Sequence, residues 1–348
     1  MPSMNMSLRI ATEQDLDRAL STPPAALVDF MCRLDGDLLL LGVAGKVGVS
    51  MAVQAVRAIR EAGVSKRVIG VARFSNPADR ATLEAAGVET IACDLTDRAA
   101  VATLPRLPNV VFLVGRKFGT EGGEDLTWAM NTLPAVHAGD VFRESRIVAF
   151  STGCVYPLVA HTTGGCTETT SPAPIGEYSQ SCLARERLFQ YCGRTFGTRV
   201  LLFRLNYAIA LRYGVLHDIA KPIWEGRPVD NRVGYVNCLW QGDVTATAIR
   251  ALDLCDASCP ALNVTGPETA AVEDIAREMG ALMGRPVTFA ADAPGDLGYL
   301  SNASRMRSLF GEPTVPLSEL IRLQADWTSH GGSSIGKPTH FEVNNGKF

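Results

Sequence analysis

Three glycines in regular spacing could bind a phosphate group. Gly42, Gly45 and Gly48 form the pattern G-x-x-G-x-x-G, directly after the apolar run Leu38–Leu41 and directly before a helical pattern. Glycines lack a Cβ atom, so phosphate can approach their backbone, and the free N–H groups of a helix N-terminus face the anion. The pattern predicts a pyrophosphate-binding loop, with an ordinary strand-to-helix turn as the alternative. The cofactor-binding residues expected in this loop are Gly42, Gly45, Lys46, Val47 and Gly48.

An arginine and an aspartate follow the second and third apolar runs. Arg73 comes directly after Ala72, where an NAD site usually has an acid for the ribose 2′-hydroxyl, and an arginine there suits a 2′-phosphate. Arg73 therefore favours NADP over NAD as the cofactor, with a solvated loop residue as the alternative. Asp94, followed by Leu95, could accept a hydrogen bond from an adenine amino group, or it could cap the next helix.

Two cations follow the fourth apolar run. Val114 ends this run, and Gly115, Arg116 and Lys117 come next. Positive charge beside a phosphate-binding loop is electrostatically favourable, and exposure to solvent is the alternative interpretation. We expect Val114 and Gly115 to contact the cofactor.

Hydroxyl groups follow the fifth apolar run. Ser151 and Thr152 come directly after it, and Tyr178 lies further on, in the first turn of a strongly helical segment. Cys182 stands one helical turn after Tyr178 and therefore lies on the same face. Ser151 is a further cofactor-binding candidate.

The segments that must position these residues alternate between strands and helices. The strand-like runs are Leu38–Leu41, Val68–Val71, Thr90–Ala92, Val110–Val114 and Ile147–Phe150, with helical patterns between them. This alternation predicts an α/β fold with a doubly wound parallel sheet of the Rossmann type. In such a sheet ligands bind beyond the carboxyl ends of the strands, which is where the candidate residues stand.

The expected organisation has four parts. Residues 1–36 form an N-terminal helical extension, which we expect to pack outside the sheet or on another subunit. A dinucleotide-binding domain covers 37–205, with sheet segments that return near 233–265. Residues 206–330 form mainly a smaller substrate-binding lobe. The tail, 331–348, has loop composition and either crosses the substrate cleft or extends into solvent.

Composition excludes several classes of protein. The chain has 348 residues, is 47% hydrophobic and carries a net charge of -3, so we expect neither a nucleic-acid nor a membrane partner. The first residues lack the features of a signal peptide, and nine scattered cysteines suit a cytoplasmic protein. The histidines and cysteines show no metal-ligand spacing.

Taken in order, these motifs resemble the extended short-chain dehydrogenase/reductase superfamily, and within it the NAD-dependent epimerase/dehydratase family. The resemblance runs from about Leu38 to Trp327. It implies that Tyr178 is the general acid/base, that Thr152 orients the substrate oxygen and that Asn131 supports the hydrogen-bond network. The implied activity is NAD(P)-dependent oxidation, reduction or epimerisation at a hydroxyl-bearing carbon of a sugar, sugar acid or sugar nucleotide.

The sequence departs from the family at Cys182. The family pattern is Tyr-x-x-x-Lys, whose lysine supplies the cation that lets a phenol with an ordinary pKa of about 10 work near neutrality. Three interpretations stay open. Lys117 or Arg116 could replace the lysine, the tyrosine or thiol could act differently, or the protein could be a catalytically impaired dinucleotide-binding protein with a structural or regulatory role.

A second departure concerns the reaction. The family's sugar 4,6-dehydratases have Asp-Glu directly after the Ser/Thr pair, and this chain has Gly153 and Cys154. Neither residue can perform the acid/base steps of water elimination, so we expect no 4,6-dehydratase activity.

The substrate candidates lie in the later segments. These are the polar or aromatic residues Arg204, Asn206, Arg212 and Trp240, in segments that resemble the family's substrate loop and lobe. An arginine among them could hold a carboxylate or phosphate through two hydrogen bonds. We expect a small carbohydrate-like substrate and a homodimer.

Overall fold

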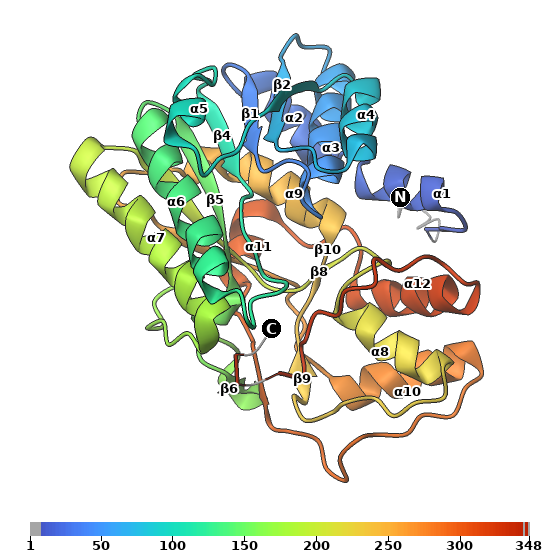
Figure 1. Ribbon diagram of the computed structural model, residues 1–348. Coiled ribbons are helices and arrows are strands. Elements are labelled where there is room, and N and C mark those ends of the chain that lie inside the picture. Colours follow the sequence, from blue (N-terminus) through green and yellow to red (C-terminus); the bar gives the residue numbers. More distant parts are fainter. Residues whose placement is uncertain (1–7, 344, 347–348) are drawn as a thin grey trace.

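A parallel seven-stranded sheet forms the centre of the larger lobe. The computed structural model describes residues 8–343 and 345–346. The strand order is β11-β7-β5-β4-β1-β2-β3, and each neighbouring pair is parallel (Figure 1). The strands are β1 (Leu38–Leu41), β2 (Val68–Ala72), β3 (Glu89–Ala92), β4 (Asn109–Phe112), β5 (Arg146–Thr152), β7 (Arg199–Leu205) and β11 (Ala261–Val264). The predicted fold class is confirmed.

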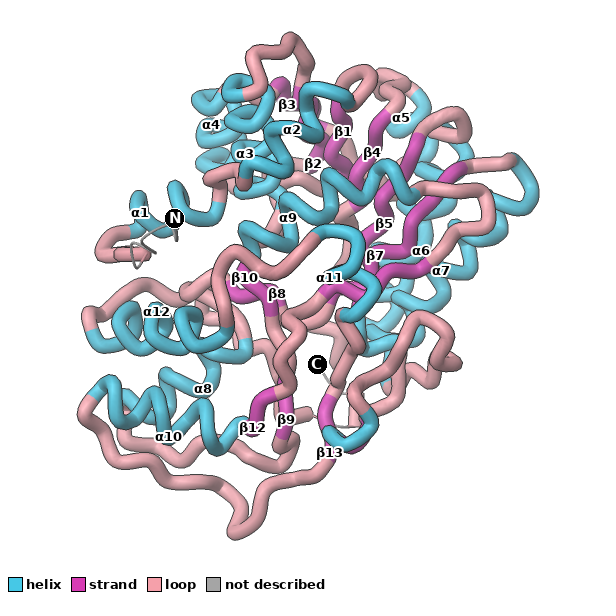
Figure 2. Tube along the Cα trace, turned by 180° about the vertical axis from the view of Figure 1, so that it is seen from behind, coloured by secondary structure: helices cyan, strands magenta, loops and turns pink. Residues whose placement is uncertain are grey.

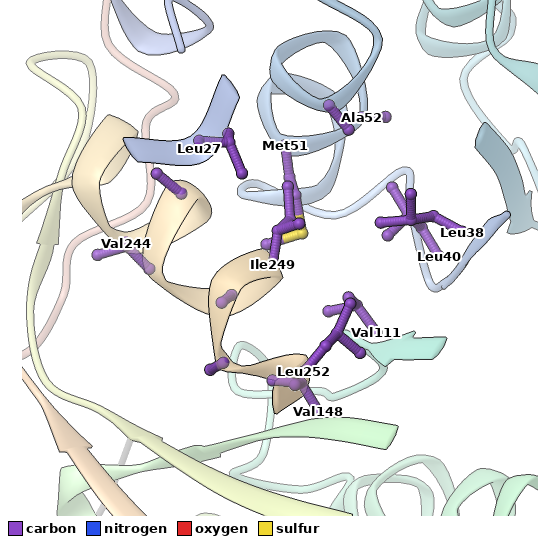
Figure 3. Close-up of a cluster of buried hydrophobic side chains, with 14 of the residues drawn as sticks. Leu27, Leu38, Leu40, Met51, Ala52, Val111, Val148, Val244, Ile249 and Leu252 are labelled. Atoms are coloured by element: carbon purple, nitrogen blue, oxygen red, sulfur yellow. The ribbon is translucent and has the colours of Figure 1, made fainter. Parts of the chain in front are cut away.

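Helices cover both faces of this sheet, which explains the continuous apolar runs. Leu38 and Leu40 of β1 join a cluster with α2, α3 and α9, shown in Figure 3, whereas Leu39 and Leu41 join a cluster with α5, α6 and α7. A strand buried on both faces needs an apolar side chain at every position. The helices are α2 (Ala25–Arg33), α3 (Gly48–Glu61), α4 (Pro77–Ala86), α5 (Arg98–Ala102), α6 (Glu124–Val141), α7 (Gly176–Phe196), α9 (Gln241–Arg250) and α11 (Ser304–Phe310).

A smaller lobe lies below the carboxyl ends of the strands in Figures 1 and 2. Its core is formed mainly by α8 (Val215–Trp224), α10 (Val272–Met283) and α12 (Leu317–Ser329). The remaining short elements are β6 (Val159–Ala160), β8 (Ala208–Ile209), β9 (Tyr235–Val236), β10 (Leu239–Trp240), β12 (Ala270–Ala271), β13 (Leu297–Gly298) and the 3-10 turns Gly153–Val155, His161–Thr163 and Ala251–Leu254.

The two N-terminal helices pack in different places. Leu27, Phe30 and Met31 of α2 are buried in the cluster against the sheet. Leu16 and Leu20 of α1 (Glu13–Leu20) join the core of the smaller lobe. The extension therefore connects both lobes. Its first residues, 1–7, lie outside the described part of the chain, and with them the stretch on which the signal-peptide expectation rests.

The described part of the tail crosses between the lobes. The backbone N–H of Ile335 donates to the carbonyl of Arg212, at 3.1 Å. Further on, the Thr339 N–H donates to Asp218 Oδ2 at 2.7 Å, and Phe341 is buried in the smaller lobe. Lys117 of the larger lobe donates to the carbonyl of Thr339, so the described tail contacts both lobes. Residues 344, 347 and 348 lie outside the described chain.

Candidate functional site

A cavity of about 1030 Å³ lies where the glycine loop, the strand ends and the smaller lobe meet. The loop contributes Gly45 to Gly48, the larger lobe contributes Tyr178, and the smaller lobe contributes Arg212 and Tyr213. Pockets for ligands commonly have volumes of about 300–1,000 Å³, so this cavity can hold a large ligand or two smaller ones. The sequence-predicted loop and the predicted proton-transfer residue therefore face the same space.

The glycine loop cannot carry side chains at two of its three glycines. Gly42 has φ +86°, and a Cβ atom there would lie 3.0 Å from the backbone nitrogen of Val114. A Cβ atom on Gly48 would lie 2.3 Å from the carbonyl oxygen of Val43. The nearest atom to a Cβ on Gly45 is 3.4 Å away, so this position has room. No side chain caps the N-terminus of α3, so the loop fits a pyrophosphate group.

Lys46 extends from the loop towards the smaller lobe. Its Nζ atom donates to the carbonyl of Ala208 at 2.8 Å and lies 4.4 Å from the centre of the Tyr213 ring. Burial, together with the charge of Arg212, lowers the pKa of Lys46 to about 7. Lys46 is exposed as a residue, but its amine contacts Ala208 and Tyr213 and can gain or lose its proton near neutral pH.

The residues expected around the adenine ribose lie at the edge of the sheet. Arg73 is exposed and is not among the residues that line the cavity. The Asp94 carboxylate accepts from Thr96 N at 3.0 Å and from Thr96 Oγ1 at 2.8 Å, which together with the charge of Arg73 lowers the pKa of Asp94. Asp97, rather than Asp94, caps α5. Leu95 is buried.

Tyr178 is a half-buried phenol in the wall of the cavity. Burial raises its pKa well above 10, and the neighbouring Cys182 and Cys154 raise it further. The charge of Arg185 and a hydrogen bond with Thr152 act in the opposite direction. The phenol that is expected to exchange a proton therefore depends on nearby positive charge.

Asn131 connects the end of β4 to the start of α7. Its Oδ1 accepts from the Arg116 N–H at 2.8 Å, and its Nδ2 donates to Ser181 Oγ at 2.8 Å. Ser181 Oγ in turn donates to the carbonyl of Tyr178 at 2.8 Å. Asn131 is fully buried, so its side chain fixes the position of the helix turn that carries the phenol.

The cations near Tyr178 differ in their partners. Lys117 Nζ donates to the carbonyl of Thr339 at 2.6 Å and lies 5.9 Å from the centre of the Tyr178 ring. Burial lowers the pKa of Lys117. Arg116 Nη2 donates to the carbonyl of Gly119 at 2.8 Å.

The sequence analysis missed Arg185, which lines the cavity and is 4% exposed. Its Nη2 lies 2.9 Å from the sulfur of Cys182. The spacing was a usable signal, because Arg185 stands three residues after Cys182 and seven after Tyr178, on one helix face. Burial raises the pKa of the Cys182 thiol, which opposes formation of a thiolate.

The remaining cofactor candidates line the same space. Val114, Gly115 and Ser151 face the cavity, as does Val47. Ser151 Oγ donates to Glu186 Oε1 at 2.6 Å.

Of the four substrate candidates, Arg212 alone is among the residues that line the cavity. Arg212 lines the cavity and pairs with Glu13 and Asp17 of α1. The other three, Arg204, Asn206 and Trp240, are buried and are not among the lining residues.

Internal partners account for the placement of two of these residues. The Arg204 guanidinium donates twice to the buried Glu186 carboxylate, at 2.9 and 2.7 Å, and once to the Tyr156 hydroxyl. Asn206 donates to Asn237 and to the carbonyl of Tyr299. A buried charge needs such a partner, so the structure holds Arg204 within the protein rather than at the cavity wall.

The described residues contain neither a membrane-spanning helix nor a cluster of metal ligands. No helix there is long and apolar enough to cross a membrane. No group of three or more His, Cys, Asp or Glu residues in that part of the chain is arranged to hold a metal ion.

Comparisons with known proteins identify a family and several solved structures with similar folds. The family model described as "NAD dependent epimerase/dehydratase family" matches residues 38–220, more than half of the chain. A comparison with curated proteins gives no match.

Three solved structures show similar folds. A UDP-galactose 4-epimerase has 21% identity and a TM-score of 0.64, with 83% of this chain and 97% of that chain covered. A UDP-glucuronic acid 4-epimerase from Bacillus cereus, in complex with NAD, has 18% identity and a TM-score of 0.66, with 84% and 98% covered. A dTDP-glucose 4,6-dehydratase from Bacillus anthracis, in complex with NAD, has 15% identity and a TM-score of 0.69, with 85% and 97% covered.

The predicted preference for NADP over NAD is wrong. The epimerase from Bacillus cereus and the dehydratase from Bacillus anthracis are both complexes with NAD. The structure adds a physical reason. The charge of Arg73 acts on the Asp94 carboxylate, and its exposed side chain lies outside the cavity lining.

Proposed function

The chain belongs to the NAD dependent epimerase/dehydratase family, and from that premise we propose that it is an NAD-dependent enzyme that oxidises, reduces or epimerises a hydroxyl-bearing carbon of a sugar-like substrate. One observation carries this proposal. The glycine loop and Tyr178 line one cavity, which also reaches Arg212 of the smaller lobe. A cofactor on the loop and a substrate between the lobes would therefore meet beside the phenol.

The residues that would hold NAD are those of the glycine loop and the adjacent strand ends. Gly45 leaves room for phosphate, and the start of α3 offers backbone N–H groups. Val114, Gly115 and Ser151 line the continuation of the cavity towards Tyr178. When bound, NAD supplies reversible hydride transfer at the carbinol carbon.

Tyr178 would move the proton that accompanies this chemistry. Oxidation of an alcohol to a ketone removes one hydride from carbon and one proton from oxygen, and we assign the proton to the Tyr178 phenolate. Thr152, hydrogen-bonded to the phenol, would orient the substrate oxygen. Asn131 would keep the first turn of α7 in register with the end of β4. Epimerisation needs the same proton returned after hydride addition to the other face.

The substrate class follows from charge in the cavity. Lys46, Lys117, Arg212 and Lys337 line it, and its acidic lining residues are Asp17 and Asp79. Positive charge in a partly enclosed space favours an anionic ligand. The solved structures named above are a UDP-galactose 4-epimerase, a UDP-glucuronic acid 4-epimerase and a dTDP-glucose 4,6-dehydratase. We therefore propose a sugar nucleotide, a sugar or a sugar acid as substrate.

Water elimination is not part of this proposal. Gly153 has no side chain, and a Cβ atom there would lie 3.1 Å from the Asn206 side chain. Cys154 is buried, so neither position offers a carboxyl group. We expect epimerisation or net redox with a sugar nucleotide. Detection of a 4-keto-6-deoxy product by mass spectrometry would contradict this expectation.

The decisive experiment separates binding from chemistry. Titration with NAD, followed by tryptophan fluorescence, tests the cofactor site, and a panel of sugar nucleotides, sugars and sugar acids then tests turnover by nicotinamide absorbance and epimer formation. Failure of the protein to bind NAD would end the proposal. Binding without any turnover would favour the second candidate, a catalytically impaired dinucleotide-binding protein, which the thiol at Cys182 supports.

We also propose a homodimer. Leu126, Leu133 and Val136 of α6 and Tyr191 of α7 are exposed apolar side chains on two helices that pack together. Exposed apolar surface of this kind marks interaction sites. Sedimentation velocity should show a dimer that Leu133→Glu dissociates, and an unchanged monomer in both proteins would refute it.

A further inference from the structure

Arg185 places a buried positive charge at the inner end of the cavity. It lies on α7, on the same helix face as Tyr178 and Cys182. Arg185 is 4% exposed, and it is among the residues that line the cavity. Among the ion pairs of the described residues, none includes Arg185. A buried charge without a carboxylate partner is costly unless another group, such as a ligand, compensates it.

The hydrogen bonds of Arg185 leave part of its guanidinium unused. Nη1 donates to the carbonyl of Val114, and Nη2 contacts the sulfur of Cys182 at 2.9 Å. Nε is buried and has no hydrogen-bond partner within the described chain. Buried donors are nearly always satisfied, so this Nε–H is an unusual unpaired donor, in a residue that also lines the cavity.

Neighbouring residues make room for this guanidinium. A Cβ atom on Gly115 would lie 3.0 Å from Arg185 Nη1, so a glycine at the end of β4 leaves the space free. Cys182 is small enough for the guanidinium to lie against its sulfur, at a position where a lysine would place a second positive charge. The small size of Gly115 and Cys182 therefore leaves the space that the Arg185 guanidinium occupies.

As a source of positive charge beside the Tyr178 phenol, Arg185 is better suited than Lys117. Burial lowers the pKa of Lys117, which weakens its hold on a proton. An arginine keeps its positive charge even when buried. The charge of Arg185 counteracts the effect of burial on the pKa of Tyr178. The charge next to the phenol is thus permanent.

We propose that Arg185 is the cation of this active site, a positioning residue that holds the inner part of the bound cofactor through its free N–H groups and favours the phenolate form of Tyr178. This inference rests on the proposed function, because it takes NAD as the ligand. It assigns to the pair Cys182 and Arg185 the work that a lysine at position 182 would do alone.

The first test measures NAD affinity without turnover. Arg185→Met should weaken NAD binding by at least about tenfold, since hydrogen bonds from a charged group are typically worth that much. Arg187→Met is the matched control, because Arg187 is exposed on the same helix and bonds to Gln190. Its affinity should equal that of the wild type. Circular dichroism and thermal unfolding of each variant show that it is folded.

The second test moves the charge. Cys182→Lys combined with Arg185→Met should regain NAD affinity, whereas Cys182→Lys alone should not, because it sets an ammonium against the guanidinium. Arg185→Lys should retain part of the affinity if the folded protein tolerates it. A residue with a merely structural role would not be rescued by a cation placed at a different position.

The pH profile supplies a third readout. In a protein that turns over substrate, the acidic limb of kcat/KM should shift to higher pH in Arg185→Met and return in the Cys182→Lys/Arg185→Met variant. If the wild type binds NAD and Arg185→Met binds it equally well with an unshifted profile, the role of Arg185 is refuted and the proposed function stands. If the wild type fails to bind NAD, both are refuted.

Discussion

At the scale of single residues, the site combines a phenol, a hydroxyl and an unusual set of cations. Tyr178 is half-buried at the cavity wall, and the loss of hydration disfavours its ionised form, so groups of the protein must help to stabilise that form. Thr152 and Arg185 both favour that form. Lys46 and Lys117 bring further charge, but burial makes the charge of each depend on pH.

The proton-transfer role of Tyr178 leads to the first prediction. Tyr178→Phe should lower kcat by about 10²–10⁴-fold, the usual contribution of a positioned acid or base, because the phenol oxygen is lost and the ring is kept. NAD affinity, measured by fluorescence, should be little changed. Tyr191→Phe is the control, since Tyr191 is on the same helix and 50% exposed. Full activity in Tyr178→Phe would exclude the assignment.

Lys46 leads to a prediction about pH. In the free protein its pKa is lowered to about 7, and an anionic ligand would raise it, so binding above this pH is coupled to proton uptake. NAD affinity should therefore be full below about pH 7 and fall as the pH rises through the higher pKa of the complex, by at most about tenfold per pH unit. Isothermal titration calorimetry across pH 6 to 9 (roughly spanning both pKa values) measures this slope.

Substitution separates Lys46 from other titrating groups. Lys46→Met should flatten the pH dependence, and Lys221→Met, which changes an exposed lysine on α8, should leave it intact. Equal slopes in the wild type and Lys46→Met would mean that Lys46 does not face the anion.

At the scale of secondary structure, the turn from β1 into α3 sets both the fold and the binding loop. Gly48 packs against the backbone of Val43, and Gly42 packs against Val114 at the end of β4. Gly45 makes no close contact of this kind. The same motif thus contains glycines that the fold requires and one that only a ligand would require.

This difference leads to a prediction that separates stability from binding. Gly48→Ala should destabilise the protein by about 1–3 kcal/mol, because its Cβ atom would lie 2.3 Å from the Val43 carbonyl oxygen. Gly45→Ala should change stability by less than about 0.5 kcal/mol and still weaken NAD binding by narrowing the approach to the backbone. Urea unfolding and NAD titration measure the two effects. Unchanged NAD affinity in Gly45→Ala would argue against a phosphate at this loop.

At the scale of the whole molecule, the tail ties the two lobes together across the site. Thr339 accepts from Lys117 of the larger lobe and donates to Asp218 of α8 in the smaller lobe. The pKa of the Asp218 carboxyl is raised by burial, which its bonds to Thr339 partly offset. Phe341 anchors the segment in the smaller lobe.

The tail leads to the last prediction. A chain that ends at Gly336 should show faster amide hydrogen exchange in α8 than the full chain, because Asp218 loses its partner and Phe341 leaves the core. Hydrogen exchange read by mass spectrometry measures this. Thr339→Val serves as the control, since it removes the hydroxyl bond to Asp218 and keeps the carbonyl that Lys117 contacts. Identical exchange in the shortened and full chains would show that the tail does not hold the two lobes together.

Contiguous residues were enough to predict five strands of the sheet, the glycine loop and the first turn of α7, whereas β7 was not among the predicted strands. These features depend on contiguous residues, because an apolar run predicts a strand covered on both faces and helical spacing predicts which side chains share a face. Tyr178 and the glycines could therefore be placed at one edge of the sheet before any contact was known. The preference for NADP failed because it rested on Arg73 alone, an exposed residue that is not among those lining the cavity.

The sequence could not predict which charged side chains line the cavity, and the tertiary structure shows them. Arg204 is paired with Glu186 inside the protein, whereas Arg185, one position before that glutamate, faces the ligand space. The course of the tail and the packing of α1 on the smaller lobe were likewise decided there. The physical reason is that a charge is stabilised by partners distant in the sequence, and local spacing does not encode them.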